Sequence, residues 1–134
     1  MHSKISYHIS KYHRYINKIK DELKHINSNY FLGLITRCKD EYFIEEFCNY
    51  YLNQGVEKIF ILDDKSSNLN IYNNINNHDK IQILYCKDNS KCHHGRCSKI
   101  CTCNRVLANE IYKNIKKYFN WIIYVDVDEF ITTK

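Results

Sequence analysis

Two aspartates stand at alternate positions directly after an apolar run. Asp126 and Asp128 flank Val127, and residues 121–125 before them read Trp-Ile-Ile-Tyr-Val. Alternate residues of an extended chain point to one side, so the two carboxylates are expected to face solvent while Val127 turns into the fold. Mg²⁺ and Mn²⁺ prefer carboxylate oxygens, with phosphate oxygens and water completing the shell. The pattern predicts a divalent-metal site that takes a diphosphate, although surface acids after a strand end give the same pattern.

Other polar side chains follow two further apolar runs. Asp63 and Asp64 come directly after one of them, and Arg37 follows another. Such acids open turns, but a carboxylate after a strand also accepts hydrogen bonds from a ribose or a base. Arg37 suits a phosphate or a neighbouring carboxylate, and Arg105 opens a predicted helix, whose N-terminus attracts anions. A structural ion pair for Arg37 and a solvated side chain for Arg105 remain open from the sequence.

The elements that must position these residues alternate along the chain. Four apolar runs without alternation predict strands buried on both faces, at residues 30–36, 58–62, 80–85 and 121–125. Helical spacing predicts helices at 41–53, which Gly55 would cap, and at 104–119, with a looser Asn-rich helical segment before the third strand. This order predicts an α/β fold with a doubly wound, mostly parallel, Rossmann-like sheet.

Parallel strands end at the same edge of a sheet, where such sheets bind ligands. We therefore expect Arg37, the Asp63–Asp64 pair and the Asp126–Asp128 pair to gather along one rim. We further expect the acids after the second and fourth strands to meet around a common cation.

The formal charge of +5 is concentrated in an N-terminal extension. Residues 1–28 hold six Lys or Arg against two acids, a net +4, and their apolar residues have near-helical spacing. We expect a basic helical extension at 1–28, either binding phosphates or simply solvated, before one compact domain at 29–134. No apolar run reaches the roughly 18 residues of a membrane span and no signal peptide is visible, so a cytoplasmic chain is expected.

Four motifs follow one another along the chain: Thr36-Arg37-Cys38-Lys39-Asp40-Glu41, Ile44-Glu45-Glu46-Phe47 with Gly55-Val56, residues 59–67, and residues 121–130. Together, from about Tyr30 to Ile131, they resemble glycosyltransferase family 92 and its family-2-like relatives. The resemblance implies the nucleotide-sugar-binding part of a GT-A fold, a nucleoside-diphosphate sugar as donor, and Mn²⁺ or Mg²⁺ as cofactor. It makes Asp126 and Asp128 the metal and diphosphate residues, and Asp63 and Asp64 the nucleoside-side acids.

The sequence departs from that family at Lys134, where it ends before the acceptor-binding region of the family. The resemblance therefore implies a donor domain that is incomplete alone, and it identifies no catalytic residue. A partner chain that supplies the remaining half, with a glycan, protein or lipid acceptor, is one expectation. An inactive remnant that still folds is another, so enzymatic activity is left open.

A Cys/His-rich insertion at residues 86–103 is the second departure. It predicts a structural Zn²⁺ site, although its spacings do not match paired C-x₂-C ligands, and reduced loop cysteines or a disulfide remain open. A different class of function follows from it, a zinc-ordered binding module whose basic N-terminal segment binds nucleic acid or an acidic partner. The candidate zinc ligands are Cys92, His94, Cys97, Cys101 and Cys103.

Overall fold

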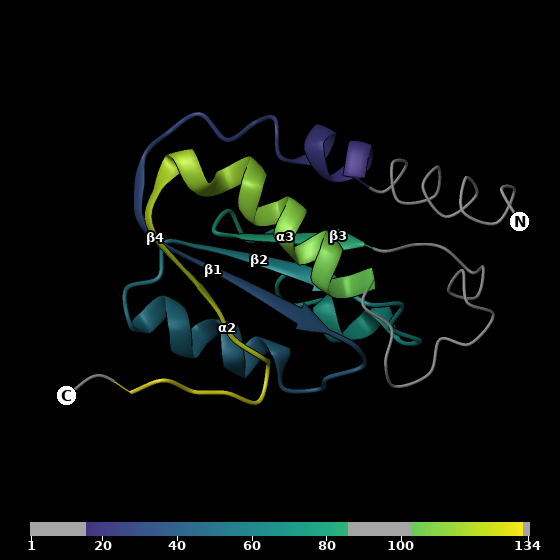
Figure 1. Ribbon diagram of the computed structural model, residues 1–134. Helices are drawn as coiled ribbons and strands as arrows, with labels where there is room; N and C mark the ends of the chain where they lie inside the picture. Colours follow the sequence, from purple (N-terminus) through teal and green to yellow (C-terminus); the bar gives the residue numbers. More distant parts are fainter. Residues whose placement is uncertain (1–15, 86–102, 133–134) are drawn as a thin grey trace, which may run out of the picture.

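In the described part of the chain, four strands form a central sheet in which every neighbouring pair is parallel. The computed structural model describes residues 16–85 and 103–132, with the backbone alone for 103–106 (Figure 1). The predicted α/β class with a parallel sheet is confirmed. The elements are β1 (Tyr30–Cys38), α2 (Ile44–Asn53), β2 (Lys58–Asp63), η1 (Leu69–Tyr72), β3 (Ile81–Tyr85), α3 (Cys103–Ile115), η2 (Lys116–Tyr118) and β4 (Phe119–Tyr124).

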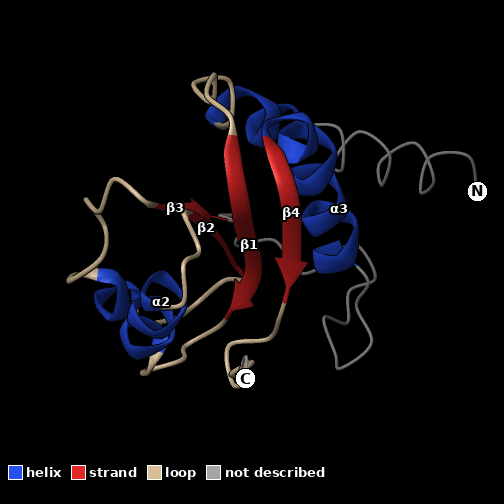
Figure 2. Cartoon of the chain, turned by 90° about the vertical axis from the view of Figure 1, so that its left-hand side faces the viewer, coloured by secondary structure: helices blue, strands red, loops and turns tan. Residues whose placement is uncertain are grey.

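The strands lie in the order β3-β2-β1-β4. The chain therefore steps outward from β1 to β3 and then returns to the other side of β1, so that the order reverses between β1 and β4. Figure 2 shows these two strands side by side with their arrowheads pointing the same way. Ligands of open parallel sheets bind at the carboxyl ends of the strands, in the crevice at such a reversal.

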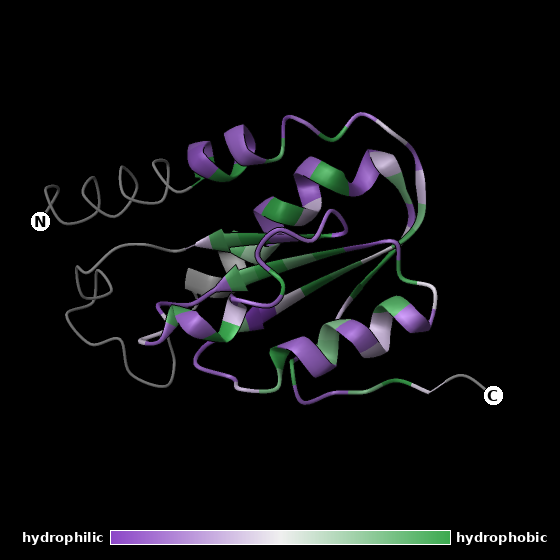
Figure 3. Cartoon of the chain, turned by 180° about the vertical axis from the view of Figure 1, so that it is seen from behind, coloured by the Kyte–Doolittle hydropathy of each residue, from purple (hydrophilic) through white to green (hydrophobic). Residues whose placement is uncertain are grey.

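Helices cover both faces of the sheet (Figure 1). Because of this, β2 is buried at every residue from Ile59 to Asp63, and most of β2 and β3 carries hydrophobic colour in Figure 3. The absence of polar alternation in β2 has the same reason. The predicted burial of β4 on both faces is wrong, because β4 is an edge strand of the described sheet in which Asn120, Trp121 and Tyr124 are exposed. The core on the α2 face includes Leu34, Ile44, Phe47, Ile59 and Val127, and the core on the α3 face includes Ile35, Phe60, Leu84, Leu107 and Ile111.

The described part of the N-terminal extension belongs to the α3-side core. Residues 16–22 are helical, and Ile19, Leu23 and Ile26 are buried beside α3. Lys18 Nζ donates to the carbonyl oxygen of Tyr85, 3.0 Å away. The helix expected at 1–28 therefore ends at residue 22 and packs on the sheet, because three apolar residues on one side of the segment are removed from water there.

The predicted helix at 104–119 differs from the structure at its C-terminal end. Helix α3 ends at Ile115, and Phe119 is the first residue of β4. Phe119 continues the four-residue spacing of Ile111 and Ile115, so periodicity alone extended the helix. The ring instead stacks on Tyr30, with 5.1 Å between ring centroids, and packs against Gly33.

The Phe119 ring leaves no room for a side chain at residue 33. A Cβ added to Gly33 would lie 2.7 Å from Cε1 of Phe119. We expect Gly33→Ala to lower the free energy of unfolding by about 1–3 kcal/mol, because a packed ring must move. Urea denaturation measures the change, and Phe119→Leu in the same chain should recover part of it. An unchanged midpoint for Gly33→Ala would show that the ring yields without cost.

Candidate functional site

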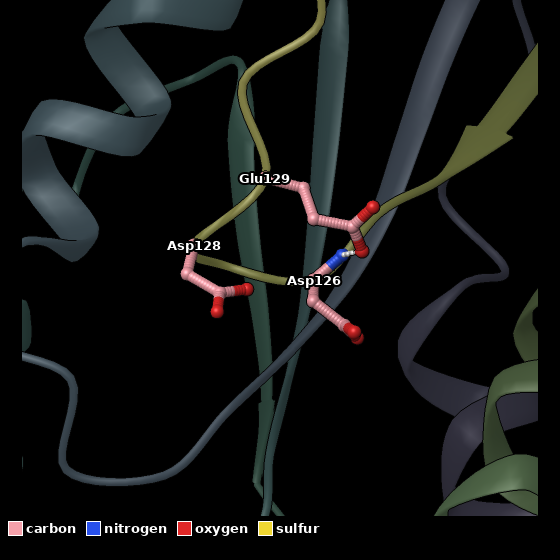
Figure 4. A group of neighbouring side chains, drawn as sticks. All are labelled: Asp126, Asp128 and Glu129. Carbon is pink, nitrogen blue, oxygen red and sulfur yellow. Dashed lines mark hydrogen bonds between the residues drawn. The ribbon is translucent and has the colours of Figure 1, made fainter.

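Three acids gather where the chain leaves β4. The Val125 N–H donates to the Ile35 carbonyl oxygen at 3.2 Å and extends the pairing with β1, after which the chain turns. Val127 is 3% exposed, while the side chains of Asp126 and Asp128 are exposed, as the sequence predicted. Glu129 joins them, and ligand oxygens of all three lie within 4.8 Å of one another (Figure 4).

A tight turn brings Glu129 to the aspartates. The Glu129 N–H donates to the Asp126 carbonyl oxygen at 2.9 Å, and the Asp126 N–H donates to Oε1 of Glu129 at 3.0 Å. Figure 4 shows this side chain folded back toward the Asp126 nitrogen. Glu129 was not among the site residues predicted from the sequence; its three-residue spacing from Asp126, the span of a β-turn, was the available signal.

Ionisation of Asp126 is disfavoured in this group. Partial burial raises the pKa of Asp126 above its usual value, and the charges of Glu129 and Asp128 raise it further, while Arg37 opposes them. Arg37 is close because the β1–β4 register pairs Ile35 with Tyr124, and two more residues bring it opposite Asp126. A hard divalent cation would offset the repulsion between these carboxylate charges, and carboxylate oxygens are ligands that such cations prefer.

Helix α2 holds the segment that follows the acids through hydrogen bonds and ring packing. The Tyr51 hydroxyl donates to the Glu129 carbonyl oxygen at 2.7 Å and accepts from the Ile131 N–H at 3.0 Å. Between them, the Phe130 ring packs edge-on against Tyr50, with 5.0 Å between ring centroids. The position of the acidic turn therefore depends on α2 as well as on β4.

Removal of the Tyr51 hydroxyl tests whether these hydrogen bonds position the acidic turn. We expect Tyr51→Phe to weaken Mn²⁺ binding about 10-fold, because outer-shell groups orient metal ligands, and to cost about 1 kcal/mol of stability. Calorimetric titration with Mn²⁺ and urea denaturation measure the two effects. Tyr112→Phe, which removes a hydroxyl from a 46% exposed ring on α3, is the control. Equal Mn²⁺ affinity in both variants would mean that the acidic turn keeps its position without the hydrogen bonds of Tyr51.

Asp63 is a buried residue of the fold. It is 3% exposed, and its Oδ1 accepts hydrogen bonds from the Tyr72 and Ser66 hydroxyls, each at 2.5 Å. Its Oδ2 accepts from the Ser66 N–H at 3.2 Å. Both oxygens therefore hold the turn after β2, and Asp64 is the more exposed acid of the pair.

The expectation of a common cation for the acids after β2 and β4 is wrong. All these acids lie at the carboxyl ends of the parallel strands, but β1 separates β2 from β4. Two strand spacings amount to about 10 Å. Ligands of one Mg²⁺, bound at about 2.1 Å, lie no more than about 4 Å apart. Among the described residues, the acid group whose ligand oxygens lie within 4.8 Å of one another contains Asp126, Asp128 and Glu129 and excludes Asp63 and Asp64.

Asp40 connects the loops after β1 and β2 by hydrogen bonds, and it was not among the site residues predicted from the sequence. Its N–H donates to Ser66 Oγ at 2.8 Å, and its carboxylate accepts from the Asn68 N–H at 3.0 Å. Backbone N–H groups of Asn68 and Ser67 hold the pKa of Asp40 below its usual value. Asp40 and Lys65 have φ of 53° and 58°, a costly left-handed conformation that the surrounding bonds maintain.

A groove of about 770 Å³ borders the acidic turn on the α2 side. It combines aromatic rings with carboxylates and amides, since Tyr42, Phe43 and Tyr50 alternate with Glu45, Glu46 and Asn49. Phe130 and Thr132 close it from the segment that follows the acids. The groove is therefore continuous with the chain that carries Glu129.

Two predicted sites lie wholly or partly outside the described residues. Arg105 falls in the first turn of α3, where its backbone alone is described. The same holds for Cys103, the first residue of α3. The other candidate zinc ligands, Cys92, His94, Cys97 and Cys101, lie outside the described ranges.

Comparisons with protein-family models, with curated proteins and with solved structures found no match. In the part of the chain that the structure describes, no helix is long and apolar enough to cross a membrane.

Proposed function

We propose that this chain is the donor-binding part of a metal-dependent glycosyltransferase. The observation that carries the proposal is the group of Asp126, Asp128 and Glu129 at the carboxyl end of β4, beside the reversal in strand order. The order β3-β2-β1-β4 matches the first strands of Rossmann-like dinucleotide-binding folds. The resemblance of residues 121–130 to family 92 supplies the substrate class, a nucleoside-diphosphate sugar, and the GT-A assignment.

Each residue of the rim has a role in this proposal. Asp126 and Asp128 hold Mn²⁺ or Mg²⁺, and Glu129 orients the turn and adds charge to the group. The bound cation would neutralise charge that builds on the departing nucleoside diphosphate. Arg37, opposite Asp126, pairs with a phosphate oxygen. Asp64, about 10 Å away across β1, accepts from the ribose or base, a separation that suits the two ends of one nucleotide.

The groove beside α2 supports the carbohydrate side of the proposal. Sugar rings present apolar faces and hydroxyl groups together, and aromatic rings interleaved with carboxylates match both. We assign the groove to the sugar or acceptor side because it borders the turn that would hold the diphosphate.

Calorimetric titration with UDP, GDP and ADP, each with Mn²⁺ and with EDTA, tests the proposal. We expect one diphosphate to bind with Mn²⁺ and to bind much more weakly without it. The same ligand should raise the melting temperature, since saturation at 100 times Kd stabilises a protein by about 2.7 kcal/mol. A cooperative melt that no nucleotide shifts would identify an inactive remnant, and binding equal in EDTA would exclude the metal role of the acids.

A further inference from the structure

A cavity of about 170 Å³ lies at the amino ends of β1, β2 and β3, between the sheet and the described part of the N-terminal extension, residues 16–29. The extension contributes His25 and Ile26 to its walls, β1 contributes Tyr30, and β2 contributes Lys58 and Phe60. Pockets for drug-sized ligands begin at about 300 Å³, so this cavity suits a smaller molecule.

The walls of the cavity lie away from the points where the described ranges stop. Tyr85 ends β3, and α3 begins with Cys103 before the chain returns to the amino end of β4, so both residues lie toward the carboxyl ends of the strands. Lys18, near the start of the described chain, is hydrogen-bonded to Tyr85. Thr132 lies on the α2 side, whereas Phe60 belongs to the α3-side core. In Figure 1 the amino ends of the strands are at the left, where the extension passes them.

Lys58 brings a cation with unused donors to this cavity. Its Nζ donates to the Asp79 carbonyl oxygen at 2.7 Å and lies 5.6 Å from the centroid of the Tyr30 ring. An ammonium group has three donors, and Lys58 forms no ion pair with the described residues. The Asp79 carboxylate is 91% exposed and lies 3.4 Å from His78 Nδ1. The Lys58 ammonium group can therefore pair with an anionic group of a ligand.

Two hydrogen-bond acceptors belong to the same walls. Gln82 Nε2 donates to the Glu22 carbonyl oxygen at 2.8 Å, whereas Gln82 Oε1 is buried and has no hydrogen-bond partner among the described residues. His25 Nδ1 donates to the same carbonyl oxygen at 2.9 Å, so Nε2 of the neutral ring is an acceptor. An unpartnered buried acceptor is costly. A ligand that carries an N–H or O–H donor would relieve that cost.

We propose that this cavity binds a small aromatic carboxylate that carries a hydroxyl or amino group. The carboxylate pairs with Lys58, the hydroxyl or amino group donates to Gln82 Oε1 or His25 Nε2, and the ring packs against the rings of Tyr30 and Phe60. Inorganic phosphate has no apolar body to bury against these rings. The cavity is at the end of the sheet opposite the acidic turn and requires neither nucleotide nor metal, so it stands apart from the proposed function.

NMR titration of the isotope-labelled full chain with para-hydroxybenzoate tests the proposal. We expect saturable shifts of the His25, Lys58 and Gln82 amide signals, with a Kd of about 1 mM or below for a ligand of this size. Benzoate, which lacks the hydroxyl donor, and para-hydroxybenzyl alcohol, which lacks the carboxylate, should each bind about tenfold more weakly. Equal affinity for the three ring compounds, or equal affinity for inorganic phosphate, overturns the proposal. The absence of saturable shifts up to about 20 mM para-hydroxybenzoate overturns it as well.

Variants of two lysines at this end of the sheet locate the site. Lys58→Met keeps the apolar stem and removes the ammonium group, so para-hydroxybenzoate should bind about tenfold more weakly and para-hydroxybenzyl alcohol as before. Lys80→Met removes an exposed cation that does not line the cavity and should change neither affinity. Circular dichroism checks the fold of both, and the ligand series in the native chain decides the question if Lys58→Met does not fold. Equal loss of affinity in both variants overturns the proposal.

Discussion

An Asp63→Ala chain is expected to lose about 3 kcal/mol or more of its free energy of unfolding. The carboxylate is 3% exposed and accepts hydrogen bonds from the hydroxyls of Tyr72 and Ser66. Its removal leaves the buried Tyr72 hydroxyl without that partner, and a buried unsatisfied group costs its full desolvation. Burial, followed by this hydrogen bond, raises the pKa of Tyr72, so the hydroxyl stays a donor at neutral pH. Urea denaturation measures the loss.

Partner variants separate the contributions within this network. Tyr72→Phe and Ser66→Ala should each cost about 1 kcal/mol, and each should cost less when Asp63 is already alanine, because the three residues share one carboxylate. Asp79→Ala removes an exposed carboxylate at the opposite end of the sheet and is the control. A small loss of stability in Asp63→Ala together with complete loss of nucleotide binding would instead make Asp63 a ligand-binding residue.

Asp126→Asn and Asp128→Asn are expected to weaken Mn²⁺ binding by about 100-fold or more, since even outer-shell changes at metal sites cost 10- to 100-fold. In the absence of metal, Asp126→Asn should not destabilise the protein. The folded-state pKa of Asp126 is raised above 3.8, chiefly by burial and then by Glu129, so its ionised form is disfavoured in the fold. Metal-free stability should fall as pH rises from about 3.8 through this raised pKa, and the asparagine should remove that slope.

Metal binding should have the opposite pH dependence. A protonated carboxyl group does not bind a cation, so Mn²⁺ affinity should fall on acidification, starting above the pH expected for an ordinary aspartate. Calorimetry between about pH 4 and pH 7 checks this against the 3.8 reference value. Asp79→Asn is the matched control and should keep the native affinity. If either site variant binds Mn²⁺ as the native chain does, the acidic turn is not the metal site.

The sequence alone determined most of the elements, because they depend on local patterns. The apolar run of β2 has no alternation because both of its faces are buried, whereas β4, predicted from the same pattern, is an edge strand of the described sheet whose Trp121 is 65% exposed. Gly55 follows α2 with φ of 103°, the conformation that a helix end asks of glycine. The exposure of Asp126 and Asp128 around buried Val127 was also predicted, although the structure places these residues in a turn and not in the extended chain from which alternation predicted it.

Tertiary structure decided which acids act together. Strand periodicity carries no information on strand order, so the place of β1 between β2 and β4, which separates Asp63 from Asp126, was not readable from the sequence. Burial of Asp63 depends on Tyr72, nine residues on, and the acidic turn depends on Tyr51, 78 residues before Glu129. Side chains far apart in the sequence meet only when the chain packs. Whether a carboxylate is a structural acceptor or a ligand is therefore set by its neighbours in space.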